Sequence, residues 1–335
     1  MAVTIKDIAD KLGVSISTVS KGLHGAPDIS ESLRTTILDT AIEMGYKTKS
    51  MRRENNKKLA IFIEYIEYEN PTDFGYELVL GFKQMAGHDK WDVKVIPITA
   101  DFQMQEKYDA FMLKNGFSGG FFMGFHSNDE WIKRMSTTTI PTVLLDLYIR
   151  RNPNVALIGT DNDESFEYSI EHLSELGHKK IALLNGPEGS MAAVSRNAAY
   201  EKYMTKYGLE LNPSLQQYGM YDEECAKQYV SDFIDAGVTA ILCGSDHIAV
   251  GVIKECFKLG YKVPEDVSVI GFDDLPMAAK NRIPITTIRQ DRGELGKSAY
   301  VILSSLVRNV AISKSLMHPK FIKRSSTGPC KDRQC

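Results

Sequence analysis

The sequence contains no apolar run that approaches the roughly 18–20 residues of a membrane-spanning helix. Its start, Met1 to Asp7, lacks the basic segment and following apolar segment of a secretory signal peptide. The five cysteines show no paired metal-ligand spacing and no pattern of a disulfide framework. These absences predict a cytoplasmic protein with no membrane partner, no metal and no cofactor.

The net charge of −3 argues against bulk affinity for nucleic acid, but the charge is unevenly distributed. Residues 1–58 carry ten Lys or Arg and seven Asp or Glu, whereas the remainder carries 30 and 36. A basic head on an acidic body is typical of a protein whose head alone contacts phosphate. The alternative is chance, because the excess of three positive charges is small.

The first 45 residues carry the signals of three short helices. Thr4, followed three residues later by Asp7, is a capping-box pattern that opens the first helix. Apolar residues then recur at helical spacing through the three segments, the second of which covers roughly 16–23. The residues that end one helix or cap the next are Gly13, Ser15, Ser30 and Gly45.

From Leu59 onward, short β-branched or aromatic runs alternate with helical stretches of about 10–15 residues. This alternation predicts βαβ units with parallel sheets. About 260 residues exceed what one doubly wound sheet needs, so we expect two similar lobes. The predicted strands are 59–66, 93–99, 120–125, 142–147, 155–160, 180–185, 238–243, 267–272 and 285–289.

The first two helices and their turn, Gly13-Val14-Ser15, have a helix-turn-helix arrangement, which places the second helix in the major groove of DNA. We expect Ile16 to pack on a thymine methyl, Ser17 to bond either base type and Lys21 to meet guanine acceptors. Hydroxyls placed to bond phosphates are Thr4, Ser15, Thr18 and Ser20. Thr4 and Ser15 are alternatively only helix caps, although both roles can hold at once.

The segments Val3–Ala9 and Gly13–Lys21 resemble the head signature of the lactose-repressor (LacI) family of bacterial transcription regulators. The similarity extends over nearly the whole chain at lower density. Further blocks are Ile140-Pro141 with Asp146, Thr160–Asn162, Leu176–Ala182, Pro264–Asp274 and Thr286–Gln290. The resemblance implies a sequence-specific repressor whose operator affinity is controlled by a small molecule, a sugar or sugar derivative, bound between two lobes.

The same resemblance implies an all-α helix-turn-helix head joined to an α/β body like a type I periplasmic binding protein, with two lobes of parallel sheet. The head is predicted at 1–46 and a basic linker at 47–58. The N-terminal lobe is predicted at 59–160 with 290–320, and the C-terminal lobe at 161–289 with 321–328. Residues 329–335 are expected to form a flexible tail.

Carrying the family pattern onto matching residues gives a set of effector contacts. Arg196 would grip hydroxyls or a carboxylate, with a surface arginine as the alternative. Asp246 and Asp273 follow strands at the carboxyl edge, where open α/β sheets bind ligands, although Asp246 is equally well explained as a helix N-cap. Tyr221 would stack on a sugar or lie in the core. Weaker candidates from the N-terminal lobe are Phe74, His126 and Asp146.

Two segments depart from the family pattern. The linker is about four residues short and lacks the usual Pro-Asn pair and Ala-Arg-x-Leu hinge helix. Met51 is the one large apolar residue there that can wedge between bases, and the favoured alternative is a basic tether that adds only phosphate affinity. The segment 64–75 has extra residues and several acids, which makes this rim of the body unusual.

Two other classes of function, an enzyme and a transport receptor, fit the sequence less well than a regulator does. An enzyme on a doubly wound fold is disfavoured because the sequence has no dinucleotide-binding fingerprint, phosphate-binding loop or nucleophile elbow. A transport receptor for sugars would need export. A regulator is expected to act as a homodimer, because one short helix reads few base pairs and two-fold symmetry doubles them.

Overall fold

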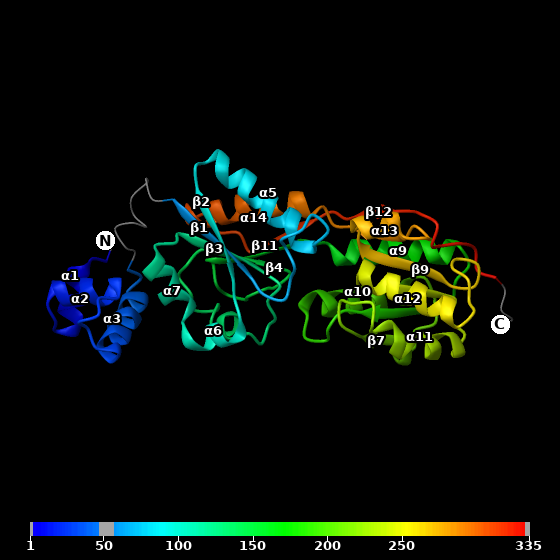
Figure 1. The fold of residues 1–335 in the computed structure, drawn as a ribbon, viewed down its shortest axis with the longest axis horizontal. Helices are drawn as coiled ribbons and strands as arrows, with labels where there is room; N and C mark the ends of the chain where they lie inside the picture. The colour runs from blue at the N-terminus through cyan, green and yellow to red at the C-terminus, as the bar shows by residue number, and fades with distance from the viewer. Residues whose placement is uncertain (1–2, 47–56, 332–335) are drawn as a thin grey trace. The chain divides into compact units, whose positions relative to one another are not determined.

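The computed structural model describes residues 3–46 and 57–331, and its first part is a three-helix head (Figure 1). The helices are α1 (Ile5–Leu12), α2 (Ile16–His24) and α3 (Glu31–Glu43). Each begins after a predicted hydroxyl residue whose side-chain oxygen accepts a backbone N–H three residues later. The buried core of the head consists of Ile8, Ala9, Val19, Leu23, Ile37, Ala41 and Tyr46.

The first sheet has the strand order β11-β5-β4-β3-β1-β2, and β1 to β5 pair in parallel. Its strands are β1 (Lys58–Ile63), β2 (Asp92–Pro97), β3 (Gly119–Met123), β4 (Thr142–Leu145), β5 (Val155–Thr160) and β11 (Lys314–Met317). The helices of this part are α5 (Phe74–His88), α6 (Ala100–Gln105), α7 (Tyr108–Asn115), α8 (Glu130–Lys133) and α14 (Arg292–Val307).

The second sheet repeats this pattern with the order β12-β10-β9-β8-β6-β7, in which only β12 is antiparallel to its neighbour. Its strands are β6 (Ile181–Asn185), β7 (Gln216–Tyr218), β8 (Ala240–Cys243), β9 (Ser268–Asp273), β10 (Thr286–Arg289) and β12 (Lys320–Ile322). Its helices are α9 (Asn162–Glu175), α10 (Met191–Lys206), α11 (Ala226–Asp235), α12 (Asp246–Lys258) and α13 (Pro276–Lys280).

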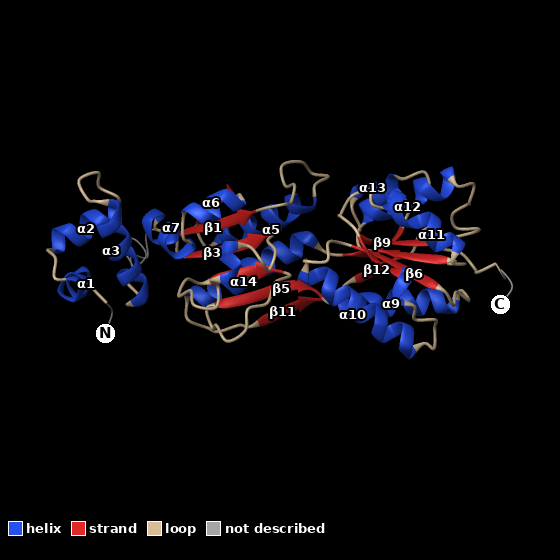
Figure 2. Ribbon diagram, turned by 90° about the horizontal axis from the view of Figure 1, so that it is seen from below, coloured by secondary structure: helices blue, strands red, loops and turns tan. Residues whose placement is uncertain are grey.

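Helices cover both faces of the second sheet (Figure 2). Successive side chains of a strand point to opposite faces, so each central strand feeds two cores. In β6, Ala182 and Leu184 pack with residues of α11 and α12, whereas Ile181 and Leu183 pack with residues of α9 and α10. Burial on both faces explains why these strands appear as continuous apolar runs in the sequence.

The parallel α/β architecture predicted from the sequence is confirmed, and each of the nine predicted runs overlaps a strand. Three strands, β7, β11 and β12, were not among those runs. Each lies at the edge of its sheet and is at most four residues long, with side chains that stay partly or fully exposed. Such strands have no apolar run to reveal them.

The contacts within the chain divide it into two compact units. Unit 1 comprises residues 1–66, 79–158 and 296–315, and unit 2 comprises 67–78, 159–295 and 316–335. The first sheet lies in unit 1 apart from the ends of β5 and β11, and the second sheet lies in unit 2. Among the described helices, none is long and apolar enough to cross a membrane.

Candidate functional site

The N-terminal face of α2 is exposed, while its other face is fixed in the core of the head. Ile16, the first residue of α2, keeps 52% of its surface exposed, whereas Val19 and Leu23 are buried. A Cβ on Gly22 would lie 2.6 Å from Cδ1 of Ile37, so only glycine lets α2 pack this closely on α3. The head therefore presents a rigid helix with an exposed apolar residue at its start.

Three of the four hydroxyls predicted to contact phosphates, those of Thr4, Ser15 and Thr18, have local partners in the structure. Thr4 accepts a hydrogen bond from the Asp7 N–H at 3.3 Å, and the Thr4 N–H donates to the Asp7 carboxylate at 2.7 Å. The Ser15 hydroxyl accepts from the Thr18 N–H at 3.0 Å and lies 2.7 Å from the Ser17 hydroxyl. Capping is therefore one role of Thr4 and Ser15, and both residues are exposed.

Lys21 and Asp28 form an ion pair on the surface of the head. Both side chains are about half exposed, and the hydrogen bond from Lys21 lowers the pKa of Asp28. An exposed pair of this kind contributes little stability, so DNA can compete with Asp28 for the ammonium group.

Ser20 lies on the same helix as Lys21, and its carbonyl oxygen is 2.7 Å from Nδ1 of His24. Met51 lies outside the described residues.

Unit 2 gathers a set of buried polar side chains at the carboxyl edge of the second sheet, which we call the unit 2 cluster. Its members come from the ends of β5, β9 and β10 and from α9, α10 and α14. They are Thr160, Asn162, Arg196, Asp273, Gln290 and Arg292, and each keeps 9% or less of its surface exposed.

Arg196 lies in this cluster, so the alternative of a surface arginine is wrong. Its Nε donates to the Asn162 side chain at 3.1 Å, and Nη1 donates to the carbonyl of Gly244 at 2.6 Å. Its guanidinium carbon lies 3.7 Å from the ring centroid of Phe272. The stacking and the hydrogen bonds fix the plane of the guanidinium group.

Asp273 ends β9 in a backbone conformation with φ of 108°, which is rare for a residue other than glycine. Its carboxylate accepts a hydrogen bond from the Gln290 amide at 2.6 Å, and the Thr160 hydroxyl donates to the other end of that amide at 2.7 Å. Burial raises the pKa of Asp273, and the positive charge of Arg196 opposes this shift. The predicted arginine and aspartate are thus brought together.

Asp246 is not a member of the unit 2 cluster. It is completely buried, and its carboxylate accepts hydrogen bonds from the Thr287 hydroxyl and the Leu275 N–H, both at 2.7 Å. The N-cap of α12 is Ser245, one residue earlier, so the alternative that Asp246 is a helix N-cap is wrong. Burial, followed by the charge of Asp273, raises the pKa of Asp246 well above its ordinary value. Asp246 therefore joins β10 to the segment after β9.

The aromatic candidates of unit 2 lie at two places. Tyr221 is exposed, with its hydroxyl 3.3 Å from that of Ser190 at the start of α10, so a core position is wrong. The ring of Phe74, the first residue of α5, has its centroid 5.9 Å from the guanidinium carbon of Arg292. Arg292 also donates to the carbonyl of Asp273 at 3.0 Å. Sequence reasoning missed Arg292, although it lies two residues after the block that ends at Gln290.

His126 and Asp146, the candidates of unit 1, follow β3 and β4. The ring centroids of His126 and Tyr65 are 4.8 Å apart, and the His126 N–H donates to Asp129 at 2.6 Å. Asp146 has a positive φ of 58°, and its N–H donates to the carbonyl of Ile158 at 2.8 Å. Both residues are partly exposed at the carboxyl edge of the first sheet.

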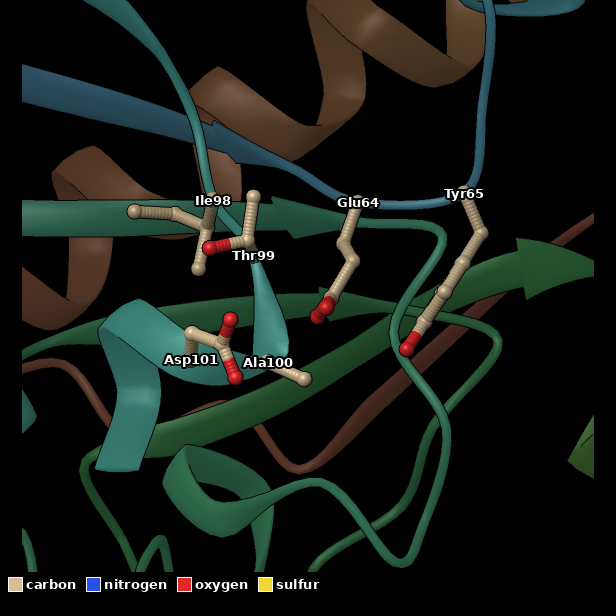
Figure 3. Close-up of a pocket in the computed structure, with 6 residues that line it drawn as sticks. All are labelled: Glu64, Tyr65, Ile98, Thr99, Ala100 and Asp101. Atoms are coloured by element: carbon tan, nitrogen blue, oxygen red, sulfur yellow. The ribbon is translucent and has the colours of Figure 1, made fainter.

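A pocket of about 430 Å³ lies at the same edge (Figure 3). In Figure 3 the carboxyl group of Glu64 points toward the segment that carries Ala100 and Asp101. Glu64 is 5% exposed and accepts a hydrogen bond from the Gln103 amide. Burial, reinforced by the charge of Asp129, raises the pKa of Glu64 to about 7. The pocket is lined by Glu64, Tyr65, Ile98, Thr99, Ala100 and Asp101.

Neither edge offers a metal centre. Within residues 3–46 and 57–331, no three His, Cys, Asp or Glu side chains come together as metal ligands. Four cysteines are free thiols in the described structure, and burial raises the pKa of Cys225 to about 11 and that of Cys256 to about 12.

Two protein families match the chain. The family described as bacterial regulatory proteins, lacI family, matches residues 4–49, and the periplasmic binding protein-like domain matches residues 170–327. The HTH-type transcriptional regulator reg1 of Streptomyces lividans is 27% identical over 344 residues, covering 98% of this chain and 97% of that protein.

Solved structures share the whole fold. The lac repressor dimer bound to operator and the anti-inducer ONPF has a TM-score of 0.68 at 24% identity, covering 98% of this chain and 100% of that chain. A complex of the transcriptional regulator CelR with cellobiose has a TM-score of 0.71 at 20% identity, covering 97% and 99%. At these identities the likeness concerns the fold, a head joined to a periplasmic-binding-like body.

Proposed function

The chain belongs to the LacI family of bacterial regulatory proteins, and from that premise we propose that it is a repressor whose operator affinity is controlled by a sugar or sugar derivative. Its full-length relatives are transcriptional regulators, so the chain is a DNA-binding regulator and not an enzyme. The observation that carries the proposal is the exposed start of α2 on a head whose other face is locked by its core. The proposed DNA-binding role also supports a cytoplasmic location.

The proposed base contacts are Ile16, Ser17 and Lys21, because all three lie on the exposed face of α2. Ile16 offers an apolar surface to a thymine methyl, and Lys21 offers an ammonium group to guanine once it leaves Asp28. Four hydroxyls around this face are proposed to contact phosphates and orient the helix: Thr4, Ser15, Thr18 and Ser20. Met51 stays a proposed minor-groove contact on sequence grounds.

A homodimer on a pseudo-palindromic operator is the proposed active form. One helix of nine residues contacts few base pairs, and a second copy doubles the length of sequence that is read. The likeness to a lac repressor dimer bound to operator supports this form and supports repression as the outcome.

The unit 2 cluster is the proposed centre of effector recognition. Arg196 and Asp273 supply fixed donors and acceptors for hydroxyl groups, and the exposed ring of Tyr221 offers a stacking surface. Phe74, His126 and Asp146 are proposed as further contacts. The likeness to CelR in complex with cellobiose supports a sugar.

A gel-shift titration of the full-length protein on DNA from upstream of its own gene tests the proposal. We expect a retarded band at low salt that a member of a sugar and nucleoside panel weakens or strengthens. Thermal shift of the protein against the same panel identifies that member independently. Failure to retard the DNA at low salt would refute the DNA-binding role, and retardation unaffected by any panel member would refute control by such molecules.

Lys21→Ala gives a sharper test of the recognition helix. We expect a loss of about 1–3 kcal/mol that is confined to one base position per half-site, measured by competition with single-base operator variants. Lys11→Ala is the matched control, because Lys11, on α1, pairs with Glu43 of α3 and is not among the proposed contacts. Equal losses on every sequence would instead make Lys21 a phosphate contact.

A further inference from the structure

The unit 2 cluster contains a buried nitrogen that lacks a partner. Arg292 is 4% exposed, and its two terminal nitrogens donate to the Asp273 carbonyl at 3.0 Å and to the Glu77 carboxylate at 2.9 Å. Within the described residues, its Nε has no hydrogen-bond partner. Buried guanidinium donors are normally all satisfied, so an unpaired one points to an acceptor that binds there.

The geometry of the guanidinium group indicates the kind of acceptor. Nε and Nη2 of an arginine lie along one edge and can donate two parallel hydrogen bonds to one carboxylate or phosphate. Glu77 occupies this edge through Nη2 alone and leaves Nε unused. The Nε–Nη2 edge is therefore suited to an acid group that accepts hydrogen bonds from both nitrogens, whereas Glu77 accepts from Nη2 alone.

The charges around Arg292 point the same way. Arg196 and Arg292 flank one buried carboxylate, Asp273, which leaves one positive charge in excess. Glu77 supplies the balance, and its side chain is 47% exposed whereas that of Arg292 is 5% exposed. A partner this exposed is displaced far more easily than a buried one.

The other titratable groups at this edge do not remove the excess. Asp274 is engaged by Arg289 and Arg324, each at 2.6 Å. Asp246 is completely buried between Thr287 and Leu275, as described above. His247, on α12, also faces Asp273 and adds no negative charge.

We propose that the effector carries an acid group, a carboxylate or a phosphate ester, and that this group binds the Nε–Nη2 edge of Arg292 in place of Glu77. The inference rests on the proposed function and names the class of its effector as an acid sugar or sugar phosphate rather than a neutral sugar. In the effector-free protein, Glu77 neutralises Arg292 as an internal substitute for that group.

Chemical rescue tests the site with inorganic phosphate as the probe. Glu77→Ala leaves Arg292 unpaired, and we expect phosphate to raise its Tm by about 2 °C or more over sodium chloride of equal ionic strength. The double variant Glu77→Ala/Arg292→Gln is the control and should show no such gain. An equal gain in both variants would mean an adventitious ion effect only and would overturn the proposal.

Calorimetry on the full-length protein tests the effector class and separates the two acid groups. The probes are D-glucuronate, D-galacturonate and D-glucose 6-phosphate, each compared with its neutral parent, D-glucose or D-galactose. We expect at least one acid form to bind about tenfold or more tightly than its parent. Arg292→Gln should abolish this preference, and Arg289→Gln, which removes the more exposed arginine beside Asp274, should keep it.

Equal binding of acid and neutral forms, binding of neutral forms only, or a preference that survives Arg292→Gln would overturn the proposal. So would the absence of any acid-sugar binding. Gel shifts on the same samples separate this failure from failure of the proposed function. If the wild-type protein binds its upstream DNA but shows no acid-sugar preference, and Glu77→Ala gains no stability from phosphate, only this inference is lost. A wild-type protein that never binds that DNA loses the function itself.

Discussion

The two sheets of the body have the same strand pattern, yet their carboxyl edges carry opposite chemistry. At the first edge, Glu64 and Asp101 line a pocket that no arginine or lysine lines. At the second edge, Arg196 and Arg292 surround one aspartate. The repeated fold supplies two equivalent places for polar residues, and the residues themselves decide what each place can bind.

The two edges also differ in how a buried carboxyl group is stabilised. Within the residues that the structure describes, no cation contributes to the pKa of Glu64. Burial raises this pKa to about 7, so protonation removes the charge near neutral pH. Asp273 is held by the Gln290 amide and lies beside two guanidinium groups, which oppose the effect of burial on its pKa. The first edge is therefore sensitive to pH, and the second is sensitive to competing anions.

The largest expected effect comes from breaking the first edge at Gly124. A Cβ there would lie 1.8 Å from the carbonyl oxygen of Glu64, and Gly124 has a positive φ of 83°. We expect Gly124→Ala to lower the free energy of unfolding by about 3–5 kcal/mol, measured in urea. Gly87→Ala is the control, because nothing lies within 4 Å of a Cβ at this exposed position of α5. A Gly124→Ala protein as stable as the control would show that the segment after β1 is not held against Gly124.

The next effect concerns the pH response of the first edge. Because the pKa of Glu64 is about 7 in the folded protein and 4.5 ordinarily, its stabilising contribution is full below about pH 4.5 and is lost as pH rises through 7. Glu64→Gln should flatten this decline, which amounts to at most about 3 kcal/mol. Urea titrations from pH 4.5 to 8 measure it, with the exposed Glu69→Gln as the control. Identical slopes for both variants would contradict the shift.

The smallest effect sharpens the comparison at the second edge. Arg196→Lys keeps the charge but loses the planar group that stacks on Phe272 and bonds Asn162 and Gly244. We expect a loss of about 1–2 kcal/mol in unfolding free energy, with operator affinity unchanged within about twofold. Arg289→Lys, at a side chain 43% exposed, should change neither quantity appreciably. Loss of operator binding in Arg196→Lys would contradict a role for this arginine that is confined to the unit 2 cluster.

How well the sequence predicted an interaction depends on how far apart along the chain the interacting residues lie. The helix caps of the head join residues three apart, so Thr4, Ser15 and Ser30 were identified from local pattern alone. The bond between Thr160 and Gln290 joins residues 130 positions apart, and no local pattern reveals it. The resemblance placed Arg196 and Asp273 correctly in one cluster, but it had no means to find Arg292.

Errors arose where a small shift changes the surroundings of a side chain. The alternative that Asp246 caps α12 is wrong, because Ser245 is the N-cap and the Asp246 carboxylate accepts a hydrogen bond from Thr287. The sequence placed Glu64 in an acid-rich segment, 64–75, but gave no sign that this residue is buried directly after β1. Burial at strand ends depends on packing from distant segments, which composition does not encode.

The contact between Gly22 and Ile37 has a consequence for anyone who redesigns operator preference. Positions 16, 17 and 21 are exposed and can be varied to read new bases, but a side chain at position 22 would push α2 away from α3. A combinatorial library over α2 should therefore hold position 22 at glycine, or enlarge it only together with a smaller residue at 37.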